Sequence, residues 1–448
     1  MRSIRVFFAI AALSILPCSA QTTGFAALDQ TATAELAHLK IPGASIAIVR
    51  GDRVVFAKAY GVADVETGEA MGPEMLFRLG STTKMMTAAA LAGLAVDGKI
   101  DLNQPIGKYL SGITPMLAGV TANQLLSHTA GIHDEAPMLG LHDDEALGAG
   151  IRAWTDAWFF TAPGKIISYA NPGYWVAGYL VETLTGKPYA DAMADRLFRP
   201  LGMVRTTLRP TIAMTYPLAQ GHEEVDGKAR IIRPAADNAS GWPAGSIFSN
   251  THDLAQFVIA FLNDGRIDGK QVLDPKTITL LSTPHAAIPG TDRSYGYGLE
   301  ISEWRGVRLL QHNGSRAGYG SEIRMLPAER VAIIVQCNKS GATLPKTADQ
   351  ALEMMVPLAP PEAVKRVAQA IAPENLSHDT GTFQNGADRI EITARDGGLY
   401  LKHGDASEIE LVKYGDAEYG PGTYIMVRDA GGKTEYVHTG LRSFARVR

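Results

Sequence analysis

The chain of 448 residues contains almost no cysteine, because Cys18 and Cys337 are its only two thiols. Cys18 falls in a stretch typical of a secretory signal. Removal of that signal leaves one thiol and excludes an intramolecular disulfide. Cys337 follows the apolar run 331–336, which is typical of a central strand. We therefore expect Cys337 to be buried in a core rather than to be a reactive thiol.

Long hydrophobic runs are also missing. The apolar run from Val6 to Leu16 follows a basic start and precedes small residues. This pattern predicts a signal peptide cleaved after Ala20 and a periplasmic or secreted mature protein. The run is too short for a permanent anchor, and no later segment reaches about 18 apolar residues, so we expect no integral membrane span. A lipoprotein signal cut before Cys18 is an alternative, but Pro17 occupies a position that needs a small residue.

An excess of positive charge is absent too. Lys and Arg number 42 against 46 Asp and Glu, for a formal net charge of −4. Loss of Arg2 and Arg5 with the signal makes it −6, which disfavours a nucleic-acid partner. The composition, 46% hydrophobic and 20% charged, is ordinary for one large or two moderate globular domains.

The order of the predicted elements indicates an α/β fold. A helix over 31–39 and a hairpin of strands 44–49 and 53–60 come first, followed by a strong helix over 81–96 that Gly98 ends. Residues 99–240 are mostly helical in pattern. Strands return at 297–301, 308–311, 322–326 and 331–336, before a helix over 346–355. The sheet is thus built from both ends of the domain, with a helical subdomain covering one side.

A second, all-β part follows. Residues 357–374 are a Pro-containing linker, and short alternating strands follow at 389–393, 399–402, 408–413, 423–427 and 435–437. We predict a signal peptide at 1–20, an α/β domain at 21–356, and a small β-meander or barrel-like domain at 375–448.

Ser81 is the first candidate nucleophile. A serine hydroxyl needs a base and oxyanion donors, and Lys84 in Ser81-Thr82-Thr83-Lys84 lies three residues later on the same helix face. The helix N-terminus and burial both lower a lysine pKa, which favours a neutral base. By spacing alone, a catalytic pair is no better supported than a serine that caps the helix and a solvated lysine.

Two further motifs support the interpretation of Ser81 as a nucleophile. Tyr169 and Asn171 form the one Tyr-x-Asn of the chain, where a phenol could relay a proton and an amide could hold a substrate carbonyl. On its own this pair is more simply a core tyrosine near a turn. A third element of the form Lys/His-x-Gly has several candidates, beginning at His312, Lys339, Lys402, Lys413 and His438. We choose His312, with Gly314, because it closes a strand of the main domain and precedes a glycine-rich turn.

Residues 25 to 355 resemble the penicillin-recognising serine hydrolases. The resembled branch holds class C β-lactamases, D-Ala-D-Ala carboxypeptidases, D-aminopeptidases and esterases. The blocks that carry the resemblance are Ile41–Gly43, Phe77–Lys84, Asp97–Lys99, Leu125–Gly131, Tyr169–Asn171, Pro200–Met203 and His312–Gly320. Several blocks in one order are more specific than any single motif. The resemblance implies a β-lactamase/transpeptidase-like antiparallel sheet flanked by helices.

The resemblance also implies roles. Ser81 would form an acyl-enzyme, Lys84 and Tyr169 would move the proton, and Asn171 would position the substrate. The N–H groups of Ser81 and Ser315 would form the oxyanion hole, and His312 would line the opposite wall. No metal or organic cofactor is implied. His312 stands where β-lactamases of this branch carry lysine, which moves the expected substrate away from β-lactams.

Other residues have simpler interpretations. The loop 128–144 holds His128, His133, His142, Asp143 and Asp144, but their spacing matches no standard metal motif. Arg316 could hold a substrate carboxylate, although a solvated loop arginine is favoured. Gly-x-Ser-x-Gly, the α/β-hydrolase elbow, does not occur.

We therefore expect a serine hydrolase that cleaves amides or esters of a small-molecule or short-peptide substrate. A peptidase on peptides with D-residues is the first interpretation, and a carboxylesterase is its close rival. A penicillin-binding sensor without turnover and a pseudoenzyme are the alternatives from other classes. A homo-oligomer is compatible with the sequence.

Overall fold

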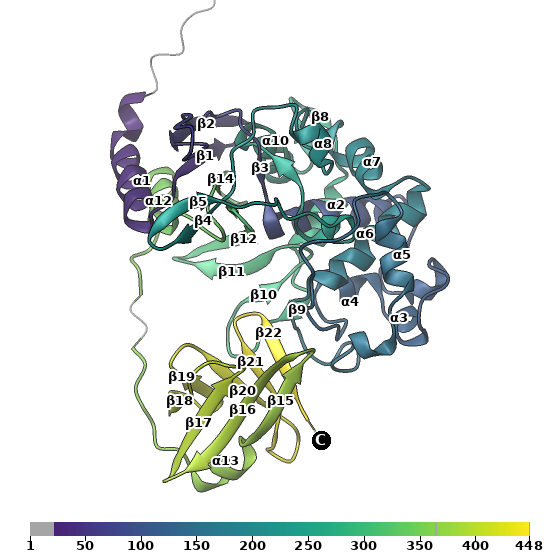
Figure 1. Cartoon of the computed structure of the whole chain (residues 1–448), viewed down its shortest axis with the longest axis vertical. Coiled ribbons are helices and arrows are strands. Elements are labelled where there is room, and N and C mark those ends of the chain that lie inside the picture. Colours follow the sequence, from purple (N-terminus) through teal and green to yellow (C-terminus); the bar gives the residue numbers. More distant parts are fainter. Residues whose placement is uncertain (1–21, 363–364, 448) are drawn as a thin grey trace, which may run out of the picture.

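The computed structural model describes residues 22–362 and 365–447, which form an α/β part and a C-terminal barrel (Figure 1). The predicted signal peptide at residues 1–20, with Cys18, lies outside the described residues. Within them, no helix combines the length and the apolar character that crossing a membrane requires.

The α/β part is built on an eight-stranded sheet in the described residues, and all of its pairings are antiparallel. The strand order is β2-β1-β14-β13-β12-β11-β10-β9. Their bounds are β1 Gly43–Arg50, β2 Arg53–Gly61, β9 Ala286–Ala287, β10 Ser294–Tyr295, β11 Glu300–Trp304, β12 Val307–Arg316, β13 Tyr319–Leu326 and β14 Val331–Cys337. Ile46 of β1 lies opposite Val335 of β14, so the two ends of the domain meet in the sheet as expected.

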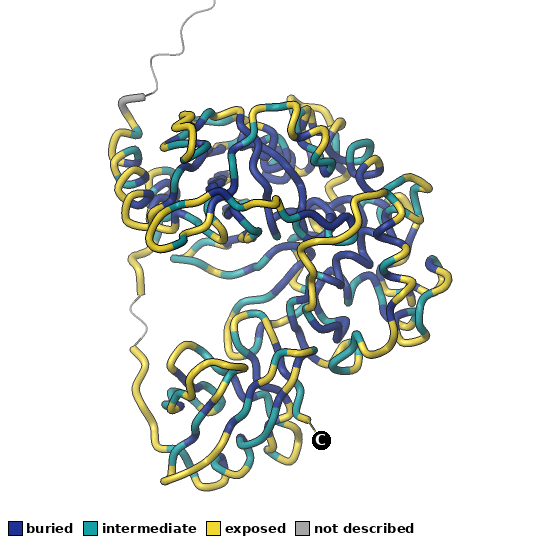
Figure 2. Tube along the Cα trace, in the orientation of Figure 1, coloured by how far each residue is buried: buried dark blue, intermediate teal, exposed yellow. Residues whose placement is uncertain are grey.

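Both faces of the central strands are buried, because side chains alternate between the faces of a strand. Ala47 and Val49 of β1 pack into the core that contains α2, whereas Ile46 and Ile48 pack with α1 and α12. Cys337 is fully buried at the end of β14, and this burial raises the pKa of its thiol. Figure 2 shows the buried trace running through the middle of this part.

Helices cover the sheet on both faces (Figure 1). On one face α1 (Ala26–Leu39) packs against α12 (Pro345–Met355), where the buried Glu35 carboxylate accepts hydrogen bonds from the N–H groups of Lys346 and Thr347. The other helices are α2 Thr83–Val96, α3 Pro115–Gly119, α4 Ala122–Leu126, α5 Ala146–Arg152, α6 Asn171–Thr185, α7 Tyr189–Met193, α8 Pro210–Ala213, α9 Trp242–Gly245, α10 Thr251–Leu262 and α11 Pro275–Ser282. Three small two-stranded sheets pair β3 Phe77–Arg78 with β6 Phe248–Ser249, β4 His222–Val225 with β5 Lys228–Ile231, and β7 Arg266–Ile267 with β8 Lys270–Gln271.

The structure differs from the predicted elements in several places. Helix α1 begins at Ala26, five residues before the predicted start at Thr31. Helices α10 and α11 were not assigned, although α10 turns the exposed His252 and the half-buried Gln256, four residues apart, to one side and buries its other residues. The strand predicted at 297–301 begins only at Glu300, because Gly298 adopts a left-handed φ of 70° against the carbonyl of Lys84.

The C-terminal part is a closed eight-stranded barrel, which confirms the predicted all-β domain. Each strand pairs with the next, and β15 also pairs with β22. The bounds are β15 Gly381–Asn385, β16 Asp388–Arg395, β17 Gly398–His403, β18 Ile409–Lys413, β19 Glu418–Gly420, β20 Tyr424–Arg428, β21 Thr434–Thr439 and β22 Arg442–Arg446, after α13 Pro373–His378. The barrel has its own apolar core, around Phe383 and Phe444.

Candidate active site

Ser81 lies in a single 3-10 turn, Gly80–Thr82, which leads directly into α2. The prediction placed Ser81 at the N-terminal end of a helix over 81–96, and in the structure α2 begins two residues later, at Thr83. The Lys84 Nζ donates a hydrogen bond to Ser81 Oγ at 3.1 Å. The spacing of three residues therefore brings the two side chains into contact.

Lys84 is fully buried and has two more acceptors. Its Nζ lies 2.6 Å from Asn171 Oδ1 and 2.8 Å from the Ala244 carbonyl oxygen. Burial lowers the pKa of Lys84 to about 7, and the Asp134 carboxylate opposes that shift. A neutral amine keeps two N–H groups for these two acceptors, so its lone pair faces the Ser81 hydroxyl. Lys84 can then accept a proton from Ser81.

Asp134 fixes the orientation of Asn171. Its Oδ1 accepts from the Asn171 backbone N–H at 2.8 Å and from Nδ2 at 3.0 Å. The Asn171 amide is thereby oriented with Oδ1 toward Lys84. The other Asp134 oxygen forms an ion pair with Arg442 of the barrel. One carboxylate thus connects the lysine, the amide and the C-terminal domain.

Tyr169 is held between its neighbours and carries an unused hydroxyl. Lys84 Nζ lies 4.8 Å from the centre of its ring. The His128 ring packs 4.2 Å from it, and His128 Nδ1 accepts from the Ala170 N–H at 3.1 Å. Burial raises the pKa of Tyr169, while the nearby Ser81 hydroxyl lowers it. Among the described residues the Tyr169 hydroxyl has no hydrogen bond of ordinary geometry, so the neutral phenol is available to a substrate.

His312 lies on β12 and uses both ring nitrogens. Nδ1 lies 2.6 Å from the Asn313 carbonyl oxygen, to which it must donate, so Nε2 accepts from the Tyr295 hydroxyl at 2.9 Å. Burial, followed by the Lys84 charge, lowers the pKa of His312 to about 3. His312 therefore remains neutral and serves as a fixed wall.

Glycines allow β12 to approach Ser81 closely. A Cβ on Gly314 would lie 1.9 Å from the Leu79 carbonyl oxygen, and one on Gly80 would lie 2.6 Å from Ser315 N. Gly80 also has a φ of 56°, in the left-handed region. The backbone of Ser315 therefore lies beside the nucleophile turn, where its N–H can serve with that of Ser81.

Two cavities meet at Ser81. One, of about 280 Å³, is here called the Met138 cavity and is lined by Met138, Asn171, Asn238, Ser315 and Arg316 as well as Ser81. The other, of about 460 Å³, is here called the Tyr169 cavity and is lined by Tyr169, His312, Gly314, Thr439 and Arg442 as well as Ser81. The predicted residues are therefore brought together around one serine with space on both sides.

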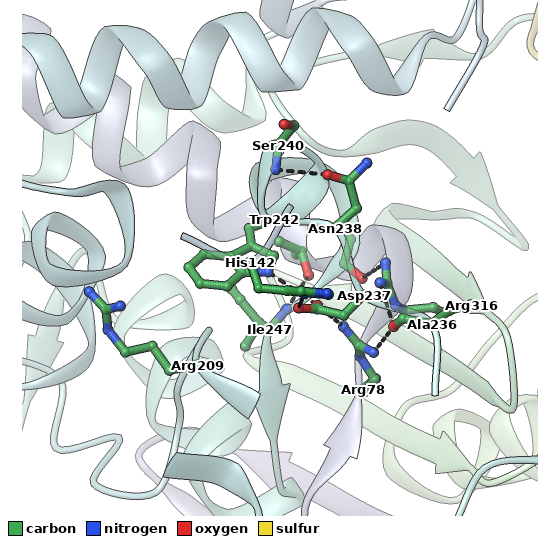
Figure 3. A network of polar contacts seen from close by, with 12 residues as sticks. Arg78, His142, Arg209, Ala236, Asp237, Asn238, Ser240, Trp242, Ile247 and Arg316 are labelled. Atoms are coloured by element: carbon green, nitrogen blue, oxygen red, sulfur yellow. Dashed lines mark hydrogen bonds and ion pairs between the residues drawn. The ribbon is translucent and has the colours of Figure 1, made fainter. Parts of the chain in front are cut away.

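Arg316 was expected as a solvated loop residue, and that expectation is wrong. It is the last residue of β12, and its guanidinium donates to the carbonyl oxygens of Gly245 at 3.3 Å and Ala236 at 3.0 Å. Figure 3 shows it beside Arg78 and Asp237. The strand continues to Arg316 because its pairing with β13 persists to Tyr319.

The histidines of the loop 128–144 have separate contacts. His128 packs on Tyr169, His133 stacks on Trp158 at 4.8 Å, and His142 Nδ1 lies 2.9 Å from Asp237 Oδ2. Across residues 22–362 and 365–447, no three or more His, Cys, Asp or Glu side chains group in a way that could hold a metal ion.

Sequence reasoning missed four contributors to the site: Asp134, Ala244, Tyr295 and Arg442. Ala244 contributes a backbone oxygen, which no side-chain pattern reveals. Arg442 reaches Asp134 across 308 positions of sequence. Asp134 lies 37 positions before Asn171, a separation that gives no spacing signal, so only the folded chain identifies it.

An antiparallel sheet with helices on both faces, and a serine and buried lysine at the start of a helix beneath it, define a serine hydrolase of the penicillin-recognising class. The Beta-lactamase family model matches residues 28–354, and the chain belongs to that family.

Curated relatives agree with this assignment. Penicillin-binding protein 4 of Amycolatopsis lactamdurans is 30% identical over 315 residues, which cover 68% of this chain and 82% of the relative. Unguisins hydrolase ungD' of Aspergillus campestris is 29% identical over 320 residues, which cover 66% of this chain but only 58% of the relative. The chain therefore spans little more than half of that second protein.

Solved structures share the fold over nearly the whole chain. The crystal structure of SurE superposes with a TM-score of 0.78 at 24% identity, covering 95% of this chain and 99% of SurE. The octameric penicillin-binding protein homologue from Pyrococcus abyssi gives a TM-score of 0.63 at 23% identity, covering 94% and 98%. The likeness includes the barrel as well as the α/β part.

Proposed function

We propose that the protein cleaves an amide or ester bond through an acyl-enzyme on Ser81, with small peptides, including peptides with D-residues, as the first substrates to test. The contact of Lys84 Nζ with Ser81 Oγ at 3.1 Å carries this proposal. Without a base, a serine hydroxyl is a poor nucleophile at neutral pH. Asn171 and Ala244 hold that base in place.

The first half of the reaction forms the acyl-enzyme. Ser81 Oγ attacks the substrate carbonyl as its proton passes to neutral Lys84. The N–H groups of Ser81 and Ser315 stabilise the oxyanion. Tyr169 donates its hydroxyl proton to the leaving amine or alcohol as the carbonyl–heteroatom bond breaks, and Lys84 returns a proton to Tyr169.

The second half releases the product. A water molecule attacks the acyl carbonyl and transfers a proton to the Tyr169–Lys84 pair. The bond to Ser81 Oγ breaks, and Oγ takes the proton back. Lys84 and Tyr169 are then as they were at the start, so the cycle consumes one water and one substrate bond.

Two alternatives use the same residues. A carboxylesterase would turn over esters without cleaving amides. A penicillin-binding sensor would acylate Ser81 without release. The names of the relatives include both a hydrolase and a penicillin-binding protein, so both alternatives need a direct test. The neutral His312 in the third motif offers no cation to a β-lactam carboxylate, which favours turnover of other substrates.

The test is incubation with D- and L-amino-acid amides, short p-nitrophenyl esters and β-lactams, followed by product analysis and intact mass. We expect wild type to release products and Ser81→Ala to lose at least about 1,000-fold in kcat/KM, as loss of a nucleophile does. Retention of full activity by Ser81→Ala would falsify the proposal. Ester turnover without amide cleavage would select the esterase, and an adduct that persists for hours would select the sensor.

Export and assembly remain proposals. The predicted signal peptide supports a periplasmic or secreted location, and N-terminal sequencing of the mature protein would measure the cleavage site. A homo-oligomer is also proposed, and light scattering of the purified protein would measure its mass.

A further inference from the structure

The position of Tyr169 assigns the two cavities to the two halves of a substrate. Tyr169 lines only one of them, together with His312 and the barrel. The residue that donates a proton to the leaving group must face that group. The leaving group therefore departs through the Tyr169 cavity, and the acyl part occupies the Met138 cavity on the other side of Ser81.

The outer wall of the Met138 cavity is a firmly attached loop. Gly140 N donates to the Asp237 carbonyl oxygen at 3.1 Å, and Ala239 N donates to the Leu141 carbonyl oxygen at 2.7 Å. Asn238 Nδ2 donates to the Pro137 carbonyl oxygen at 2.9 Å. These bonds hold the loop against segment 237–239, so the acyl side of the cleft is a built site.

Arg316 lines the Met138 cavity, and Arg78 and Asp237 lie next to it, behind the lining (Figure 3). Asp237 Oδ1 accepts from Arg78 Nη2 at 2.9 Å and from Trp242 Nε1 at 3.2 Å, while its Oδ2 contacts His142 at 2.9 Å. Both oxygens of the one carboxylate are thus engaged without Arg316 (Figure 3). Two guanidinium groups therefore lie beside a single carboxylate, whose charge opposes the lowering of the Arg316 pKa but which forms no ion pair with Arg316.

Arg316 is the guanidinium without a carboxylate partner. Its two hydrogen bonds go to the carbonyl oxygens of Gly245 and Ala236, and among the described residues it forms no ion pair. Its buried Nε has no acceptor. Burial and then the Arg78 charge lower the pKa of Arg316 to about 9, so it remains a cation at neutral pH. Partly buried cations are normally paired, and this one faces a cavity that opens on Ser81.

The other arginine of the cleft differs in this respect. Arg442 lines the Tyr169 cavity, but its guanidinium already pairs with Asp134. The arginine on the leaving-group side of the cleft, Arg442, thus already has a carboxylate partner. The arginine on the acyl side, Arg316, has none among the described residues.

We propose that the Met138 cavity binds a carboxylate carried by the acyl part of the substrate, and that Arg316 is its cationic partner. This inference rests on the proposed acyl transfer at Ser81 and adds the substrate class, an acidic acyl group. A guanidinium pairs with a carboxylate through parallel N–H donors, which gives orientation as well as affinity.

The test uses two matched ester pairs. In the first, p-nitrophenyl hydrogen adipate and its methyl ester differ only in a charge on the acyl part. In the second, 4-acetoxybenzoate and its methyl ester differ only in a charge on the leaving group. With spontaneous hydrolysis subtracted, we expect wild type to prefer the charged adipate about 10- to 100-fold in kcat/KM, the range of a charge-assisted hydrogen bond. We expect no comparable preference in the second pair.

Four variants locate the charge that is responsible. Arg316→Gln should bring the adipate ratio to near one, and Arg316→Lys should restore part of it. Arg209→Gln removes an arginine from the same region that pairs with Asp144 and Asp191 and lines neither cavity, so it should keep the wild-type ratio. If Arg442→Gln abolishes the adipate preference and Arg316→Gln does not, the assignment to the Met138 cavity is wrong.

A binding measurement separates this inference from the proposed function. Titration calorimetry on Ser81→Ala compares adipate with monomethyl adipate and needs no turnover. We expect adipate to bind more tightly, and Arg316→Gln in the same background to remove the difference. Equal binding of the two, unchanged by Arg316→Gln, would overturn the inference whether or not the wild type hydrolyses esters.

Discussion

Lys84 combines two properties that are costly in most proteins, since it is a fully buried amine and its pKa lies near neutrality. The burial that lowers the pKa also removes the solvation of the charged form. Asn171 Oδ1 and the Ala244 carbonyl oxygen offset part of that cost by accepting its N–H groups. The result is an amine that changes protonation state in the range where the enzyme works.

The pH dependence of acylation follows from this pKa. Only neutral Lys84 can accept the Ser81 proton, and its pKa of about 7 lies below the ordinary 10.5. We therefore expect kcat/KM for a neutral ester to rise with pH through a midpoint near 7 and then to level off. Stopped-flow measurement between about pH 5 and 9 would show this limb.

A variant of Asp134 tests whether Lys84 determines the midpoint of this pH profile. Its negative charge raises the Lys84 pKa, so Asp134→Asn should move the midpoint to lower pH. Asp143→Asn removes the same charge from the same loop without contact to Lys84 and should leave the midpoint in place. A limb that stays at the same pH in Asp134→Asn would show that another group controls it.

The predictability of single residues depends on sequence distance. Ser81 and Lys84 are three positions apart, and Tyr169 and Asn171 are two apart, so short motifs identified them as candidates, and their place in the family-like blocks favoured a catalytic role. The Asp134 and Arg442 pair depends on the docking of two domains, and no local pattern encodes it. Arg316 was visible but misjudged, because its burial depends on the segment 236–245 folding over it.

Strand β12 is the element on which the cleft depends, because it carries His312, Gly314, Ser315 and Arg316 in succession. Ser321 on β13 donates to the Leu79 carbonyl oxygen at 2.6 Å and lies 2.9 Å from Thr82 Oγ1, so the sheet also holds the nucleophile turn. This contact leaves no room for a side chain between β12 and Leu79.

Gly314→Ala should therefore damage both stability and catalysis. The added Cβ would lie 1.9 Å from the Leu79 carbonyl oxygen and 2.3 Å from Ser321 Oγ. We expect the free energy of unfolding to fall by about 1–3 kcal/mol, as overpacking does, and kcat/KM to fall at least tenfold as Ser315 moves away from Ser81. Urea denaturation and ester kinetics would measure the two effects.

Gly119→Ala is the matched control. A Cβ at Gly119, an exposed residue at the end of α3, meets nothing within 4 Å. Its stability should stay within about 1 kcal/mol of wild type, since Ala is the better helix former. Equal behaviour of the two variants would mean that β12 can retreat from Leu79 without loss.

The elements themselves were predictable where composition and turn residues marked them. Gly51-Asp52 marked the hairpin of β1 and β2, and a run rich in Ala, Leu and Met before Gly98 marked α2, and the structure confirms both. Helix α10 was missed, although His252 and Gln256 form a polar side on an otherwise buried helix. The closure of the barrel by β15 and β22 is a long-range pairing that short alternating runs do not specify.

At the scale of the whole molecule, the barrel completes the cleft of the α/β part. The turn between β21 and β22 supplies Thr439, Leu441 and Arg442 to the Tyr169 cavity. The Leu441 carbonyl oxygen accepts from the Tyr169 backbone N–H at 2.7 Å, and Ser443 N donates to Ser168 Oγ at 3.2 Å. The backbone that presents the proton donor is thus held by the second domain.

Removal of the barrel should leave a folded but altered hydrolase. The two large cores of the α/β part contain no barrel residue, so a chain that ends at Pro361 should keep its secondary structure and unfold cooperatively. Tyr169 would lose the Leu441 acceptor, and the Tyr169 cavity would open to solvent. We expect kcat for a small ester to fall about 10- to 100-fold, because proton donation then lacks a fixed geometry. Esters with bulky leaving groups should lose less, since the turn no longer limits the cavity.

Circular dichroism checks the fold, and full-length Arg442→Gln separates loss of the ion pair with Asp134 from loss of the cover. An unchanged ratio of small to bulky esters in the shortened protein would show that the barrel has no part in selecting the leaving group.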